Sequence, residues 1–97
     1  MIEKLQQVEN RYELLQDRSQ RPDFYQDPKQ AAKVMKELDE EQPIIAAFRR
    51  YKKTQQELEE IRQMLSDGLE PEMKALCQEE FSAAKQTLAE LTDTLRV

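Results

Sequence analysis

Apolar residues near the C-terminal end recur at alternating steps of four and three, and this spacing constrains the fold more than any other feature. The series is Met73, Cys77, Phe81, Ala84, Leu88, Leu91 and Leu95. Residues spaced in this way share one face of an α-helix and form a stripe of the coiled-coil type. A matching series lies upstream, interrupted only by Thr54, and comprises Ile44, Ala47, Tyr51, Leu58, Ile61 and Leu65. The sequence therefore predicts two long helices with apolar stripes that face each other.

The segment between these two helices carries strong stop and start signals. Ser66-Asp67-Gly68 ends the upstream helix, because glycine adopts the left-handed conformation that closes a helix at little cost. Pro71 then suits the first turn of the next helix. Since short links join neighbouring antiparallel helices, the two stripes are expected to fold back on each other as a hairpin.

A third, shorter helix is expected at the N-terminus, from about residue 2 to residue 17. Its apolar face would carry Ile2, Leu5, Val8, Tyr12 and Leu15. The period is then lost until Asp27-Pro28, where Asp is a favoured N-cap and Pro a favoured first helical residue. From there Ala31, Met35 and Leu38 keep helical spacing.

Pro43 falls inside this second helical pattern. A proline there removes one backbone hydrogen bond and crowds the preceding turn, which predicts a kink or a break near residues 40–42. A kink is favoured, because no Gly, Asn or Ser loop signal accompanies Pro43.

The predicted fold class is therefore all-α: a three-helix bundle with a long antiparallel helical hairpin, whose second helix is kinked or broken near Pro43. Residues 1–97 are expected to form a single helical domain, with helices over about 2–17, 28–65 and 71–95. A dimeric coiled coil is the alternative, and Gly68 and Pro71 count against its uninterrupted stripe. The oligomeric state stays open.

The amino-acid composition argues against a catalytic or cofactor-binding site in this chain. It has no histidine, one cysteine and one glycine, so a histidine-based catalytic site, a zinc site, an intrachain disulfide and a phosphate-binding loop are not expected. Cys77 falls on an apolar stripe and is interpreted as a buried small hydrophobe. No enzyme activity, cofactor, metal or small-molecule substrate is predicted.

Neither a membrane nor nucleic acid is favoured as a partner by composition. No apolar run approaches the roughly 18 residues of a membrane span, and the N-terminus does not resemble a signal peptide. A cytoplasmic location is therefore expected. The formal net charge of −5 would repel phosphate backbones on average.

One basic segment is the candidate partner-contact patch: Phe48-Arg49-Arg50-Tyr51-Lys52-Lys53. Cations with interleaved aromatics suit phosphates and RNA bases. The alternative is an ordinary solvated face, with Tyr51 on the stripe and Phe48 at its edge.

Two other groups have plainer interpretations. The acidic run of Glu37, Asp39, Glu40 and Glu41 is expected to be a solvated face first and a docking surface second. Apolar residues off the stripes are expected to pack under a neighbouring helix rather than form an exposed patch: Phe24, Tyr25, Ile45 and Leu69.

Read in order, several strings resemble the N-terminal domain of bacterial class I peptide chain release factors. They are KLQQVENRYE (4–13), DPK (27–29), EL (37–38), PII (43–45), FRRYKK (48–53), ELEE (57–60), ML (64–65), PEMK (71–74) and EE (79–80). Each string is weak alone, but the ordered set covers nearly the whole chain.

The resemblance implies a helical domain that contacts the ribosome and the class II release-factor GTPase. In this family, stop-codon reading and peptidyl-tRNA hydrolysis belong to later domains. The Gly-Gly-Gln motif of hydrolysis cannot occur in a chain with one glycine. We therefore expect an excised domain or a truncated gene product with a docking role. The alternatives are a free-standing RNA-binding helical hairpin and a structural coiled-coil module.

Overall fold

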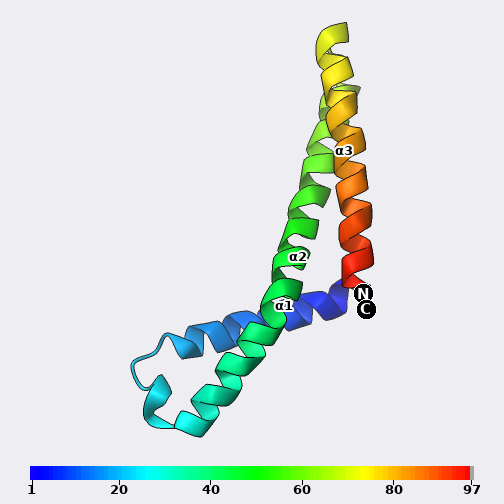
Figure 1. The fold of residues 1–97 in the computed structure, drawn as a ribbon. Coiled ribbons are helices and arrows are strands. Elements are labelled where there is room, and N and C mark those ends of the chain that lie inside the picture. The colour runs from blue at the N-terminus through cyan, green and yellow to red at the C-terminus, as the bar shows by residue number, and fades with distance from the viewer. Residues whose placement is uncertain (97) are drawn as a thin grey trace. The chain divides into compact units, whose positions relative to one another are not determined.

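The chain is built from helices. The computed structural model describes residues 1–96, and within them α1 (Ile2–Ser19), a 3-10 turn (Phe24–Gln26), α2 (Pro28–Ser66) and α3 (Pro71–Leu95) follow one another (Figure 1). No strand occurs in these residues. The predicted all-α class is confirmed.

Two compact units divide the chain, Met1–Ala46 and Ala47–Val97, and α2 contributes to both. The expectation of one domain over residues 1–97 stays a prediction.

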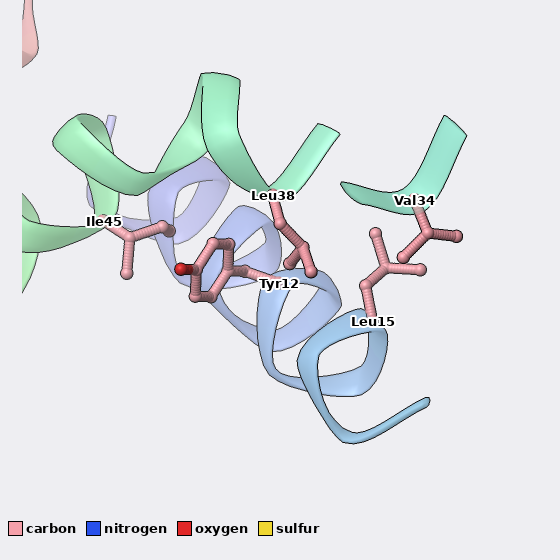
Figure 2. Packing of buried hydrophobic residues seen from close by; sticks show 5 residues of the cluster. All are labelled: Tyr12, Leu15, Val34, Leu38 and Ile45. Atoms are coloured by element: carbon pink, nitrogen blue, oxygen red, sulfur yellow. The ribbon is translucent and has the colours of Figure 1, made fainter. Parts of the chain in front are cut away.

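The first unit pairs α1 with the N-terminal half of α2. Figure 2 shows Tyr12 and Leu15 of α1 lying against side chains of α2, and the cluster they form is Tyr12, Leu15, Val34, Leu38 and Ile45. Val8 and Phe24 pack against this cluster and are partly buried. Phe24 also meets the Tyr25 ring edge-on, at 4.9 Å between centroids. Tyr25 itself is exposed, so the expectation that it packs under a helix is wrong.

The start of α2 follows the predicted capping chemistry. Asp27 precedes the helix and its Oδ1 accepts a hydrogen bond of 3.2 Å from the backbone N–H of Gln30. This bond satisfies one of the donors that a helix leaves free in its first turn. Pro28 occupies the first helical position, where no backbone donor is lost.

Helix α2 continues through Pro43 without interruption. A break near residues 40–42 does not occur. The helix therefore tolerates the missing backbone hydrogen bond and the crowding that Pro43 brings.

The second unit is the predicted antiparallel hairpin. The C-terminal half of α2 and the whole of α3 lie side by side along it (Figure 1). Gly68 has φ +77°, the left-handed conformation expected at the end of α2. Buried apolar side chains line the interface, namely Tyr51, Leu58, Cys77, Leu91 and Leu95. The interpretation of Cys77 as a buried hydrophobe is confirmed.

The apolar stripe of α2 differs from the expected one by one residue over part of its length. Met35 and Ile44 are exposed, whereas Val34, Ile45 and Phe48 are buried. The stripe runs through residues 34, 38, 41, 45 and 48, so a glutamate, Glu41, stands at one of its positions. Because Glu41 is charged, the apolar pattern in the sequence is interrupted at a buried position. The exposed apolar residues Met35 and Ile44 instead suggest a register shifted by one residue.

The outer ends of the other stripes are more open than expected. Ile2 and Met73 are exposed, at the first turns of α1 and α3 respectively. Terminal turns have fewer neighbours to cover them.

Candidate partner-contact site

The four cations of the predicted patch lie on α2 in the second unit. Arg49, Arg50 and Lys53 are exposed, and Lys52 is half-buried. The Lys52 Nζ lies 4.6 Å from the centroid of the Phe48 ring. The ammonium group therefore makes a cation–π contact with a fully buried aromatic side chain.

The two aromatic residues of the segment belong to the core. Phe48 is fully buried and Tyr51 is 7% exposed. Their rings are stacked, with centroids 6.5 Å apart and 17° between planes, and Gln55 Nε2 donates a 3.1 Å hydrogen bond to the Tyr51 hydroxyl oxygen. Neither ring is available to stack on a base. The hypothesis that these aromatics serve an RNA contact is therefore wrong, and only the cations remain.

A hollow of about 340 Å³ on the hairpin brings two of these cations together. Arg50 and Lys53 line it, and Arg49 and Lys52 do not. The rest of its wall is Thr54, Glu57, Ala84 and Thr87. The cations thus stand over a polar recess formed by two packed helices.

Small side chains explain the hollow. Thr54 is the residue that interrupts the apolar stripe of α2, and Ala84 is the smallest member of the stripe on α3. Because both line the same recess, they leave it unfilled between the longer flanking side chains. Thr54 Oγ1 is already engaged, since it donates a 2.8 Å hydrogen bond to the Arg50 carbonyl oxygen. The two small residues were visible in the sequence, but their juxtaposition required the hairpin register.

The acidic run on α2 in the first unit is not uniformly solvated. Arg11 of α1 donates through Nε to Glu37 Oε2 at 2.9 Å and through Nη2 to Glu37 Oε1 at 3.2 Å. This bidentate hydrogen bond to a carboxylate raises the pKa of Arg11. Asp39 and Glu40 are exposed, as expected, but Glu37 and Glu41 are half-buried. The expectation of a solvated face is wrong for these two glutamates.

Glu41 is the most unusual carboxylate of the described residues. Its Oε2 is buried and has no hydrogen-bond partner. Burial raises the pKa of Glu41, and the neighbouring charges of Glu37 and Glu40 raise it further, while Arg11 opposes them. Another glutamate, Glu9 of α1, is also buried and accepts a 3.0 Å hydrogen bond from Gln6 Nε2. Neither burial was predicted, because a charged residue gives no apolar signal.

Over residues 1–96, no three His, Cys, Asp or Glu side chains gather as metal ligands. None of the helices in that range is both long and apolar enough to cross a membrane.

The sequence of this helical chain matches a known domain family. The PCRF domain family matches residues 8–97. The chain belongs to this family. The resemblance of its strings to the N-terminal domain of class I release factors is thereby confirmed.

Relatives of this PCRF domain carry the name peptide chain release factor 1. The protein of Bacillus licheniformis is 31% identical over 97 residues, that of Ligilactobacillus salivarius 33%, and that of Symbiobacterium thermophilum 36%. Each alignment covers 100% of this chain and 27% of the relative. The chain therefore spans about a quarter of the length of these proteins. No solved structure matches it.

Proposed function

We propose that this PCRF domain is the docking domain of a translation termination factor, and that it contacts the ribosome and the class II release-factor GTPase in the cytoplasm. The observation that carries the proposal is the family match over residues 8–97, together with relatives named peptide chain release factor 1. Codon reading and ester hydrolysis would belong to parts of the protein outside this chain, which itself would perform no catalysis.

The hairpin supports a docking role through its cations. Arg50 and Lys53 project from a packed pair of helices, so little conformational freedom is lost by the backbone when they bind. They lie one turn apart on α2 and share the hollow with the hydroxyl-bearing residue Thr87. This combination suits a phosphate group of ribosomal RNA, which accepts from cations and hydroxyls alike.

The proposal is tested in a protein that carries this chain together with the rest of a release factor. Arg50→Gln with Lys53→Gln is expected to weaken co-sedimentation with ribosomes at moderate salt and to leave hydrolysis on saturating ribosomes unchanged. Lys29→Gln with Lys33→Gln, two exposed lysines of the first unit, is the matched control and should bind as the parent does. Equal ribosome binding by the parent and both double variants would show that Arg50 and Lys53 do not take part in the contact.

Deletion of residues 1–97 tests the docking role as a whole. The shortened protein is expected to associate less with ribosomes and to lose its interaction with the purified GTPase in a pull-down. If both interactions persist unchanged, the chain is not a docking domain.

A further inference from the structure

Three apolar side chains near the connection between α2 and α3 have no cover within the second unit. Met64 is 44% exposed, Met73 46% and Leu76 48%. Met64 lies in the last turn of α2, and the other two lie in the first turns of α3. We call these three residues the methionine patch.

The methionine patch and the hollow lie on the same face of the hairpin. The hollow is lined from α2 by Arg50, Lys53 and Glu57, and from α3 by Ala84 and Thr87. Seven, eleven or fourteen residues make close to two, three or four whole turns, so residues with these separations lie on nearly the same face of a helix. Met64 follows Glu57 by seven residues, and Glu80, Leu76 and Met73 precede Thr87 by seven, eleven and fourteen residues.

The opposite face of the hairpin is protected differently. There the half-buried ring of Phe81 has the Arg62 guanidinium carbon 5.9 Å from its centroid and Lys85 Nζ 5.6 Å from it. Two cations thus cover the aromatic group on that side. The methionine patch has no such cover, so the two faces are chemically distinct.

Charge around the patch is predominantly negative. Residues 59–80 contain seven acidic residues (Glu59, Glu60, Asp67, Glu70, Glu72, Glu79 and Glu80) and two basic ones (Arg62 and Lys74), a net charge of −5. The whole chain also has a net charge of −5. The entire excess of negative charge is therefore concentrated around the methionine patch, and Arg62 is directed to the opposite face.

We infer that the methionine patch docks a basic amphipathic helix of a protein partner. The partner's apolar face would cover Met64, Met73 and Leu76, and its flanking Lys or Arg residues would meet Glu60 and Glu80. Methionine side chains adapt to different apolar shapes, which suits a surface for helices. Complementary charge would fix the orientation and speed the encounter.

A second copy of this chain fits the patch poorly. Two such ends would bring acidic surroundings against acidic surroundings, at a cost in free energy. Nucleic acid is disfavoured for the same reason. The inference deepens the proposed docking function and rests on it only for the statement that the chain acts through its surface.

The test uses a synthetic Leu/Lys peptide of about four helical turns, with leucines at helical spacing, and the 97-residue chain. Fluorescence anisotropy is expected to detect binding of this peptide. A scrambled peptide of the same composition, which has no apolar face, should bind at least about tenfold more weakly, and a Leu/Glu peptide of the same pattern should not bind.

The combined variant Met64→Gln, Met73→Gln and Leu76→Gln is expected to weaken Leu/Lys binding by at least about tenfold, because three apolar contacts are lost. Leu14→Gln with Met35→Gln, two exposed apolar residues of the first unit, is the matched control and should bind as the parent does. Circular dichroism checks that both variants remain helical.

Three results would overturn the inference: unchanged Leu/Lys affinity in the patch variant, equal binding of the scrambled peptide, or a dimer in sedimentation that the patch variant abolishes. None of these results depends on ribosomes. Failure of the inference is therefore separable from failure of the proposed function, which the Arg50 and Lys53 variants and the deletion test.

Discussion

Single charged residues explain most of what is unexpected in this chain. Glu41 stands at a core position of α2 with a buried oxygen that lacks a hydrogen-bond partner. Arg11, whose positive charge acts on Glu41, is already bound to Glu37. An acceptor left unsatisfied in this way costs free energy, so Glu41 weakens the first unit near neutral pH.

Glu41→Gln is expected to raise the free energy of unfolding at pH 7 by on the order of 1 kcal/mol, because it removes the buried charge and keeps the shape. The raised pKa means that the native carboxyl binds a proton more readily than the unfolded one. Stability of the parent therefore falls as pH rises from the ordinary glutamate value through the raised pKa.

Urea denaturation at two pH values measures this effect. The advantage of Glu41→Gln should shrink below the ordinary glutamate pKa of about 4.3, where the parent is protonated as well. Glu59→Gln, at an exposed position of α2, should show no advantage at either pH. A stabilisation of equal size at both pH values would mean that charge burial at Glu41 is not its source.

The sequence was most informative about where the helices begin and end. Four residues mark the two ends of α2 and the start of α3: Asp27, Pro28, Gly68 and Pro71. Each acts through its own backbone conformation or capping side chain, so its effect can be predicted without tertiary contacts. The register of the stripe on α2 was less predictable. Glu41 interrupts it, and Met35 and Ile44 supply a false apolar period beside it.

The candidate site required tertiary contacts that a linear pattern does not contain. The four cations could be listed from the sequence, but the grouping of Arg50 and Lys53 with Thr87 depends on which residues of α3 face α2. Likewise, the burial of Phe48 removes it from the surface although its neighbours in sequence are charged. Composition identifies a basic segment, and packing decides which of its side chains are available.

Pro43 lies in the interior of a continuous α2, so its replacement is expected to change the stability of the whole helix. Pro43→Ala is expected to raise the free energy of unfolding by about 1 kcal/mol or more, because it restores a backbone donor and relieves crowding. Urea denaturation followed by circular dichroism measures the change. Pro28→Ala is the control: at the first helical position no bond is gained, so stability should change little. Destabilisation by Pro43→Ala would indicate that core packing around Ile45 depends on the geometry that the proline imposes.

Charge is unevenly distributed over the molecule as a whole. Residues 59–80 account for the full net charge of −5, so the remaining residues balance to zero. The cluster of Arg49, Arg50, Lys52 and Lys53 is therefore local and is not part of a broad positive field. A chain of this kind is suited to a contact with a defined position, whereas long-range attraction of polyanions needs a net positive surface.

This distribution predicts that the isolated chain is a poor general RNA binder. Free single-stranded RNA gains affinity from many phosphate contacts and from bases stacked on exposed aromatics. Here Phe48 and Tyr51 are buried, and two cations share the hollow. Fluorescence anisotropy with a labelled single-stranded RNA is expected to give a Kd weaker than about 100 µM at physiological salt, beyond the weak end of the usual range of non-specific binding. Much tighter binding that falls steeply with salt, and that Arg50→Gln with Lys53→Gln abolishes, would favour a free-standing RNA-binding hairpin over a docking domain.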